Sequence, residues 1–397
     1  MLVDKQAILE AFTLGPLLEE AKNQAGLSDF GDEGFIVALE KMQECIAEDA
    51  RLDAQGLGVS RQTTVRHLIN RLRFQDDLKR HPEILEEDVS DPMVILGLPR
   101  SGTTKTHRMM GVDPNLLKTY MWQLVNPAPI PGAGAAVPDP RIAAAYDQEP
   151  LLPANDANPA LRAGHLYAAA EVQEDLWLFG LTFNYAMFTR PLSVRHYEYL
   201  LTERFPSDLD NYAYFKSLIQ YLQWQQGGRK GRRWLFKNTG NIAYLDALTR
   251  TFPRASYIHI HRHPAKSIPS VIKLATEGYR TEDANVDPLY ISAFMHLRSK
   301  ESVDRYLESR DRLGLNDRIY DVQYEQIRQD PMPVIREFYD RAGHELTPDS
   351  EQRMLRYEAE NEQGKHGEHR YSLEQFGLSE KHIEENFGEY IRRFIPN

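Results

Sequence analysis

The stretch from Met93 to Lys105 constrains this chain most, because an apolar strand leads at once into a turn of small polar residues and then into a helix. It reads Met-Val-Ile-Leu-Gly-Leu-Pro-Arg-Ser-Gly-Thr-Thr-Lys. Backbone N–H groups at the start of a helix have no partner within the helix, and the helix dipole favours negative charge there. The sequence therefore predicts a cradle for a phosphate-like anion.

The turn departs from the usual nucleotide-binding loop in one respect. The spacing from Gly97 to Gly102 is that of a Walker loop, but Thr103 occupies the position of the Walker lysine, and Arg100 supplies the positive charge from within the loop. This substitution counts against an ATP-dependent kinase, as does the lack of an apolar strand ending in a Walker-type aspartate. A P-loop kinase is kept as a less favoured alternative.

A second segment of the same kind covers residues 255–270 and reads Ala-Ser-Tyr-Ile-His-Ile-His-Arg-His-Pro-Ala-Lys-Ser-Ile-Pro-Ser. It predicts a buried strand, a polar turn and a helix. Together the two segments resemble the sulfotransferases, which transfer a sulfuryl group from 3′-phosphoadenosine 5′-phosphosulfate (PAPS) and release 3′-phosphoadenosine 5′-phosphate (PAP). In this resemblance the first turn is the 5′-phosphosulfate loop, and the second segment is the 3′-phosphate element.

Four further segments are similar to a bacterial-type branch of that family. They are Gly26–Phe35, Trp234–Gly240, Tyr320–Ile327 and the late Gly-Lys-His-Gly loop Gly364–Tyr371. The resemblance therefore covers nearly the whole chain. It implies an α/β fold with a P-loop-like, mostly parallel sheet flanked by helices.

The first 90 residues are predicted to form a helical region packed on this core. Apolar residues recur at helical spacing within 35–45 and 65–72, and helices are expected from about Val3 to Asp88. Asp91 precedes a proline, which disfavours helix and marks a boundary. We expect a helical region at 1–90 and the sulfotransferase α/β domain at 91–397.

The resemblance also implies which residues bind the donor. These are Pro99, Arg100, Ser101, Gly102, Thr103 and Thr104 in the first turn, Arg262 and Ser270 at the 3′-phosphate, and Lys365, Gly367 and Arg370 in the late loop. Arg100 and Lys237 would in addition be catalytic, because positive charge is needed where the leaving phosphate gains negative charge. The competing interpretations are a solvated strand-end lysine for Lys237, a surface salt bridge for Arg262 and a solvated charge cluster for the late loop.

The general base is the least determined part of the predicted site. Many family members carry Trp-Glu before the proline-rich loop, whereas this chain has Trp122 followed by Gln123, which cannot accept a proton at neutral pH. The remaining candidates are His165, Glu171 and Glu174, of which we place His165 first and Glu171 second. A non-catalytic PAP-binding protein of the same fold is therefore a further alternative.

A metal site is the other alternative that the second segment raises. His259, His261 and His263 alternate along the predicted strand, which would place three imidazoles on one face. No aspartate or further histidine motif is seen to complete a ligand set, and Arg262 would repel a metal ion. We predict no metal.

The composition of the chain limits the kinds of molecule that the protein is expected to bind. The chain has 397 residues, a formal net charge of −11 and one cysteine, Cys45, so a disulfide framework is excluded, and broad binding to nucleic acid is disfavoured. No apolar run of about 18 residues and no signal-like amino terminus is present, so we expect a cytoplasmic protein without a membrane span. The oligomeric state is left open.

The acceptor is expected to be a small or medium, apolar molecule with a hydroxyl group. Its pocket would draw on the loop at 120–135 and on the aromatic residues between Glu171 and Gln225. Packing of these aromatic residues in the core is the favoured interpretation, with an aromatic-lined acceptor pocket as the alternative. The Pro/Gly/Ala-rich stretch from Asn126 to Arg141 is expected to be an irregular loop, either a functional lid or a packing connector.

Overall fold

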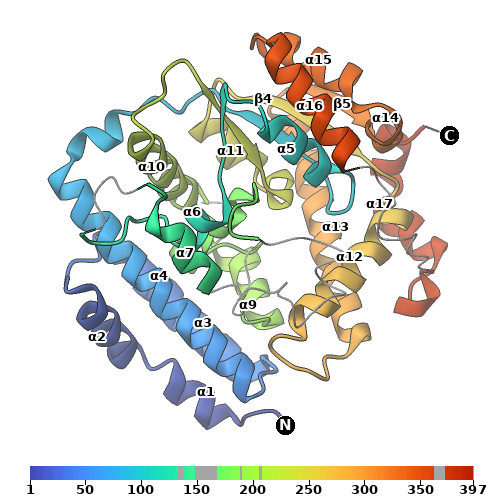
Figure 1. Ribbon diagram of the computed structural model, residues 1–397. Helices are drawn as coiled ribbons and strands as arrows, with labels where there is room; N and C mark the ends of the chain where they lie inside the picture. The colour runs from blue at the N-terminus through green and yellow to red at the C-terminus, as the bar shows by residue number, and fades with distance from the viewer. Residues whose placement is uncertain (133–136, 148–167, 188–189, 205–207, 362–371, 397) are drawn as a thin grey trace.

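The computed structural model describes residues 1–132, 137–147, 168–187, 190–204, 208–361 and 372–396 (Figure 1). A five-stranded sheet lies at the centre, with strands β1 (Met93–Leu96), β2 (Leu116–Leu117), β3 (Arg233–Lys237), β4 (Ser256–His261) and β5 (Ile319–Gln323). The strand order is β2-β3-β1-β4-β5, and every neighbouring pair is parallel. The predicted mostly parallel α/β sheet is confirmed.

Both faces of the sheet are covered, which explains why β1 is apolar at every position. Val94 and Leu96 belong to one core cluster, whereas Met93 and Ile95 belong to another on the opposite face. Since β1 lies between β3 and β4, the turns that follow these three strands meet at one edge. In open α/β sheets such an edge is where ligands bind.

Helices follow the strands on either side. They are α5 (Thr103–Gly111), α6 (Met121–Val125), α7 (Pro140–Asp147), α9 (Val194–Tyr199), α10 (Leu209–Gln225), α11 (Leu245–Thr251), α12 (Pro264–Tyr279), α13 (Pro288–Arg312), α14 (Tyr324–Gln329), α15 (Pro331–Ala342), α16 (Pro348–Glu360) and α17 (Glu380–Phe394). Short 3₁₀ helices are η1 (Pro82–Glu86), η3 (Asp175–Thr182), η5 (Thr239–Ile242) and η6 (Glu374–Phe376), and Leu200–Arg204 (η4) is a π-helix. None of the described helices combines the length and apolar character that crossing a bilayer requires.

The amino-terminal residues are helical as predicted, in α1 (Lys5–Ala11), α2 (Leu14–Ala25), α3 (Gly34–Asp49) and α4 (Ala54–Arg80). Asp4 and Asp53 cap α1 and α4 by accepting backbone N–H bonds of 2.8 Å. In Figure 1 these helices form one side of the molecule, opposite α14–α16. Their apolar faces share one core cluster with Phe183, and the Arg71 guanidinium donates to the Leu181 carbonyl oxygen at 2.9 Å. The helices are therefore packed against the segment that contains η3.

Most of the aromatic residues predicted between Glu171 and Gln225 lie in the core. Phe179 stacks on Tyr185 and Phe215, with ring centroids 4.0 and 4.7 Å apart, and Tyr212 packs beside them. The favoured interpretation, core packing, is thus correct for these residues. Between α6 and α7, the described residues 126–132 and 137–139 contain no helix or strand.

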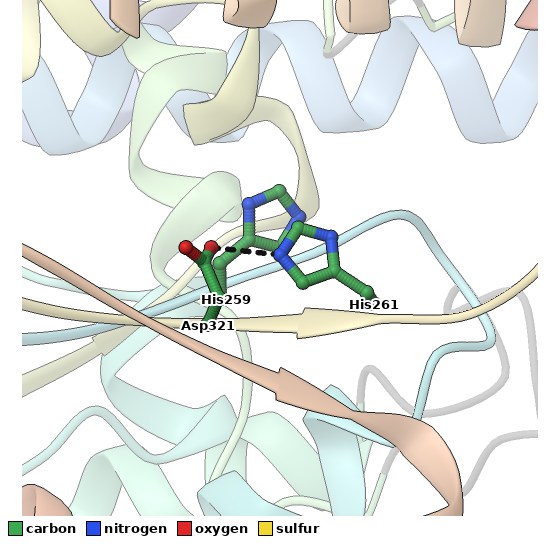
Figure 2. A group of neighbouring side chains, drawn as sticks. All are labelled: His259, His261 and Asp321. Carbon is green, nitrogen blue, oxygen red and sulfur yellow. Dashed lines mark hydrogen bonds and ion pairs between the residues drawn. The ribbon is translucent and has the colours of Figure 1, made fainter. Parts of the chain in front are cut away.

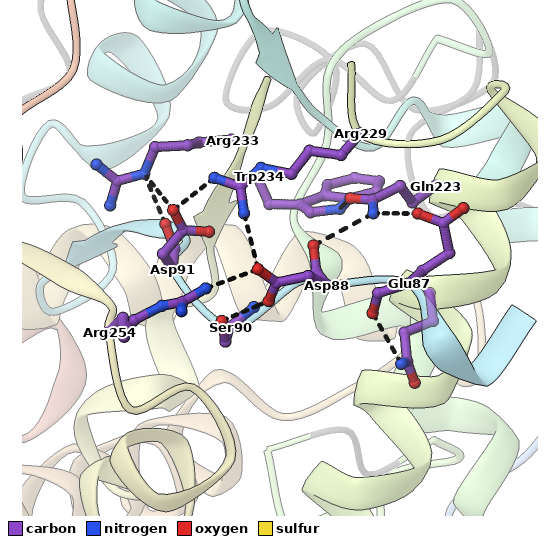
Figure 3. Close-up of polar contacts among 10 residues, drawn as sticks. Glu87, Asp88, Ser90, Asp91, Gln223, Arg229, Arg233, Trp234 and Arg254 are labelled. Carbon is purple, nitrogen blue, oxygen red and sulfur yellow. Dashed lines mark hydrogen bonds and ion pairs between the residues drawn. The ribbon is translucent and has the colours of Figure 1, made fainter. Parts of the chain in front are cut away.

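At the amino-terminal edge of the sheet, acidic residues that precede β1 are held by three arginines, Arg229, Arg233 and Arg254 (Figure 3). Asp88 accepts from Arg229 at 3.2 Å and from Arg254 at 2.6 Å, and Asp91 accepts from Arg229 at 2.6 Å. Burial alone would raise the pKa of Asp88, but hydrogen bonds from Ser90 and Arg254 outweigh it and lower that pKa to about 2. This network fixes the entry to β1 at the edge opposite the predicted anion site.

Candidate active site

The turn after β1 has a backbone that requires glycine. Gly102 has φ +90°, and a Cβ there would lie 3.1 Å from the Tyr324 ring. At Gly97, with φ +151°, a Cβ would lie 2.8 Å from the Ile260 carbonyl oxygen. Arg100 itself has φ +69°, a conformation uncommon for residues with a side chain. The turn is thus folded tightly against β4 and α14.

The two predicted phosphate-binding segments meet in space. Arg262 donates to the Arg100 carbonyl oxygen at 2.5 Å, and the Arg100 Nε donates to the Ser270 hydroxyl at 3.1 Å. The Arg262 guanidinium also lies over the Tyr324 ring, 4.2 Å from its centroid. Residues separated by 162 to 170 positions in the chain are therefore in direct contact.

These contacts surround a hollow of about 660 Å³, part of which is open to solvent. Its lining residues are Pro99, Arg100, Gly102, Thr103, Thr104, Lys105, Glu174, Lys237, Thr239, Arg262, Leu274 and Tyr324. Four of these side chains are cationic and one, Glu174, is acidic. The hollow is suited to an anion although the whole chain is acidic.

Lys237 ends β3 and reaches the start of α5. Its side chain is buried, its ammonium donates to the Thr104 hydroxyl at 3.2 Å, and it forms an ion pair with Glu174. Burial lowers the pKa of Lys237, although the neighbouring Glu174 carboxylate acts in the opposite direction. The solvated strand-end lysine considered from the sequence is therefore wrong.

Ser101 differs from the other residues predicted in the first turn. Its side chain is fully buried, and its hydroxyl donates to the Leu98 carbonyl oxygen at 2.7 Å. It is also absent from the lining of the hollow. The observed side-chain contact therefore stabilises the turn, whereas Thr103 and Thr104 lie on the hollow.

The three candidate bases are placed differently. His165 lies outside the described residues, as do Lys365, Gly367 and Arg370 of the late loop. Glu171 is 3.7 Å from the Arg108 guanidinium and does not line the hollow. Glu174 does line it and accepts from the Thr239 N–H at 3.4 Å. Among the described candidates, geometry favours Glu174 over Glu171.

Gln123, which stands where a glutamate was expected, has a structural role. Its Oε1 accepts from the Tyr120 N–H at 3.0 Å and completes a capping box at the start of α6. The side chain is 3% exposed. It does not line the hollow between Arg100 and Lys237.

Next to Glu174, Asp175 positions the end of β3. One of its carboxylate oxygens accepts from the Lys237 backbone N–H at 2.8 Å, and the other has no hydrogen-bond partner in the described part of the chain. Burial raises the pKa of Asp175 to about 7, a change that this hydrogen bond only partly offsets. The carboxyl group is therefore largely protonated in mildly acidic solution.

We expect Asp175→Asn to change how stability depends on pH. Because the folded-state pKa is raised, the contribution of Asp175 to folding is most favourable below its unfolded pKa and is lost as pH rises towards 7. Relative to the asparagine variant, the wild type should lose on the order of 4 kcal/mol of unfolding free energy between pH 4 and 8. Urea unfolding of both proteins across this range measures the difference. A difference that is constant with pH would show that the carboxyl group has an ordinary pKa.

The histidines of β4 form a buried cluster away from the hollow (Figure 2). The rings of His259 and His261 stack at 4.0 Å, and the His261 Nε2 and the Asp321 Oδ1 are 2.8 Å apart. The expectation that no aspartate joins them was wrong, because Asp321 of the neighbouring strand was not considered. His263 does not join them, since it caps α12 by accepting from the Ala265 N–H at 3.1 Å.

Most ligand atoms of this cluster are already engaged. Arg310 donates to both oxygens of Asp321 at 2.7 and 2.6 Å, and the other ring nitrogen of His261 is 2.8 Å from the Tyr390 hydroxyl. A cation bound here would lie next to the Arg310 guanidinium. The observed contacts connect α13 and α17 to the sheet, which is a structural role.

The structure defines a class of fold: a parallel α/β sheet flanked by helices, with a cation-lined hollow between two converging strand ends. The model of the sulfotransferase family matches residues 92–348. Because the match includes more than half of the chain, this protein belongs to the sulfotransferase family. The recognition made from the two loops is thus confirmed at the level of the family.

Relatives of known identity agree with this assignment. The omega-hydroxy-beta-dihydromenaquinone-9 sulfotransferase Stf3 of Mycobacterium bovis is 27% identical over 233 residues, which are 56% of this chain and 57% of that protein, and the Mycobacterium tuberculosis Stf3 matches equally. The match therefore spans little more than half the length of these curated relatives.

Two solved structures share the fold across almost the entire chain. Sulfotransferase STF9 of Mycobacterium avium has a TM-score of 0.83 at 24% identity, with 97% of each chain covered. Sulfotransferase STF1 of M. tuberculosis has a TM-score of 0.75 at 23% identity, with 95% of this chain and 98% of that one covered. The fold thus includes the amino-terminal helices as well as the sheet.

Several lining residues were not predicted as site residues, namely Lys105, Thr239, Leu274 and Tyr324. Tyr324 follows β5 directly, and Thr239 follows β3 after one residue. Their positions at the carboxyl ends of strands were a usable signal, because these ends share one edge of a parallel sheet. Lys105 and Leu274 lie inside helices and had no comparable signal.

Proposed function

We propose that this sulfotransferase takes its sulfuryl group from PAPS and transfers it to a hydroxyl group of a small or medium, apolar acceptor. The observation that carries the proposal is the contact of Arg262 and Ser270 with Arg100. A group bound by the first turn and a second phosphate bound by Arg262 and Ser270 would belong to one molecule. PAPS has such a pair of anionic groups, on the 3′ and 5′ oxygens of its ribose.

The residues of the hollow fit this donor. The N–H groups at the start of α5 and the hydroxyls of Thr103 and Thr104 would bind the 5′-phosphosulfate, with Arg100 beside them. Arg262 and Ser270 would bind the 3′-phosphate, and the late-loop residues Lys365, Gly367 and Arg370 are proposed to complete the nucleotide site. PAPS supplies an activated sulfuryl group on a phosphate leaving group.

The charges of the side chains in the hollow indicate which catalytic role each residue would have. The Lys237 ammonium, held between Thr104 and Glu174, would offset negative charge on the transferring group and the departing phosphate, together with Arg100. Glu174 would accept the proton of the acceptor hydroxyl, in place of the base first sought at His165 or Glu171. Its ion pair with Lys237 holds the carboxylate within the hollow.

The acceptor class is drawn from the chemistry of the site and from a relative. A carboxylate base and a cation that offsets developing negative charge suit an alcohol or phenol. The relative Stf3 is named for an omega-hydroxy-dihydromenaquinone substrate, an apolar molecule with a hydroxyl group. We propose an apolar hydroxyl acceptor for this chain on the same grounds.

Calorimetric titration with PAP and ATP, followed by turnover of labelled PAPS with a panel of alcohols and phenols, tests the proposal. We expect PAP to bind at micromolar concentration or better, ATP to bind more weakly, and at least one acceptor to be sulfated. Tighter binding of ATP than of PAP would favour a kinase. Binding of PAP without turnover on any member of the panel would favour the non-catalytic alternative.

A further inference from the structure

A second cavity lies between the amino-terminal helices and the core, outside the donor hollow. The centre of a water-sized sphere can move through about 60 Å³ of it, and the unfilled space around that, which includes open solvent, is about 740 Å³. Its walls include Met42 of α3, Thr63 of α4, Trp177 and Gly180 of η3, and Phe183. None of these residues lines the donor hollow. The amino-terminal helices, in which the sequence showed no chemistry, thus form one wall of a largely apolar cavity.

The wall of this cavity contains an imidazole whose two ring nitrogens are left without a hydrogen bond in the described part of the chain. His196 lines the cavity and is 2% exposed, and neither of its ring nitrogens has a hydrogen-bond partner among the described residues. Burial lowers the pKa of His196 to about 4, so the ring is neutral near pH 7 and offers one donor and one acceptor. A buried polar group without a partner is costly, and a ligand that pairs with it removes that cost.

Two elements lead from the donor hollow to this cavity. Glu174 lines the hollow and Gly180 lines the cavity, and the six residue-to-residue steps of 3₁₀ helix from one to the other span about 12 Å. Leu274 of α12 lines the hollow, and Thr281, two residues after the end of α12, lines the cavity, a separation of about 10 Å at the rise of a helix. The two elements thus give similar separations, about 10–12 Å, between the donor hollow and the cavity.

We propose that this cavity binds the distal part of the acceptor, and that the acceptor is an elongated apolar alcohol or phenol with a second hydrogen-bonding group about 10–12 Å from the reacting hydroxyl, paired with His196. The inference rests on the proposed function, since it takes the reacting hydroxyl to lie at Glu174 and Lys237. It adds a substrate shape and a specificity residue to that function. A hydroxyl or carbonyl oxygen at the distal end is the matching chemistry for a neutral imidazole.

The binding of 1,10-decanediol and of 1-decanol to the PAP-loaded protein, measured by calorimetry, tests the proposal without relying on turnover. His196→Phe keeps an aromatic ring but removes both nitrogens, so it should weaken binding of the diol about tenfold and leave 1-decanol unchanged. Thr63→Phe fills the cavity from α4 and should abolish binding of both. Gln62→Phe, on the exposed side of the same helix, is the matched control and should bind both as the wild type does.

The outcomes separate this inference from the proposed function. Thermal unfolding and the affinity for PAP are measured for every variant, and the affinity for PAP should match the wild type. His196→Phe should be at least as stable as the wild type, because it removes two buried nitrogens that have no hydrogen-bond partner among the described residues. If the wild type binds PAP but neither alcohol, or if Thr63→Phe binds the diol normally, the cavity is not an acceptor site. Equal weakening of both alcohols by His196→Phe would overturn the role of the imidazole. Failure of the wild type to bind PAP would instead refute the proposed function.

Discussion

Replacing Lys237 by methionine is expected to lower kcat about 10³-fold, because a buried cation aimed at developing charge accounts for a large part of the rate in such sites. Methionine has a similar length and no charge, so β3 and the start of α5 should keep their packing. Glu174 would lose its ion-pair partner and Thr104 a hydrogen bond. Steady-state turnover of labelled PAPS gives the effect on kcat, and the affinity for PAP, measured in parallel, gives the effect on nucleotide binding.

Lys41→Met is the matched control, since Lys41 lies on the surface of α3, where it contacts Glu44 and the Tyr199 ring and does not line the donor hollow. It should retain wild-type turnover. The affinity of Lys237→Met for PAP should change by no more than about tenfold, as the 3′-phosphate residues are untouched. A Lys237→Met enzyme with more than a tenth of the wild-type kcat would remove Lys237 from the proposed catalytic group.

Replacing Glu174 by glutamine is expected to lower kcat/KM by about 10²–10³-fold, because a positioned base contributes that much to proton transfer. The amide keeps the shape of the side chain but cannot take a proton. The wild-type rate should fall as pH decreases and the carboxylate is protonated, and this acidic decline should be absent from the variant. The pH profile of kcat/KM thus distinguishes a lost base from a lost structural contact.

Glu171→Gln separates the two described candidates for the base. Glu171 contacts Arg108 outside the hollow, so its variant should keep activity within a few-fold of the wild type. Glu337→Gln, at an exposed ion pair on α15, controls for the general effect of losing a carboxylate. If Glu171→Gln lost activity and Glu174→Gln kept it, the ranking drawn from the sequence would be restored.

The parts of the fold that depend on local sequence were predictable. The apolar strand from Met93 to Leu96 and its glycine turn are encoded within a few residues, as is the strand that leads to Arg262. Since both strands are parallel neighbours, their turns share one edge, and the contact between Arg262 and Arg100 follows from topology. The helical character of the first 90 residues was equally local. The assigned boundary at residue 90 remains a prediction.

The sequence leaves open the roles that depend on packing between distant segments. Ser101 stays a predicted donor ligand, and its hydroxyl is seen to bond within the turn. Glu174 was placed after Glu171, because no local pattern shows which of two nearby carboxylates faces Lys237. Asp321 was not connected with the β4 histidines, since it comes from the adjacent strand about 60 residues later. Each depends on tertiary contacts that the periodicity of the sequence does not encode.

The central claim is that two strand-end turns bind the 5′-phosphate and the 3′-phosphate of one nucleotide, and the affinities for PAP and AMP test it most directly. AMP differs from PAP only in lacking the 3′-phosphate, the group assigned to Arg262 and Ser270. We predict that the wild type binds PAP about 10²-fold more tightly than AMP, and that Arg262→Met removes most of this difference while affecting AMP little. Equal affinities for PAP and AMP in the wild type, or a preference for PAP that survives Arg262→Met together with Ser270→Ala, would contradict the account.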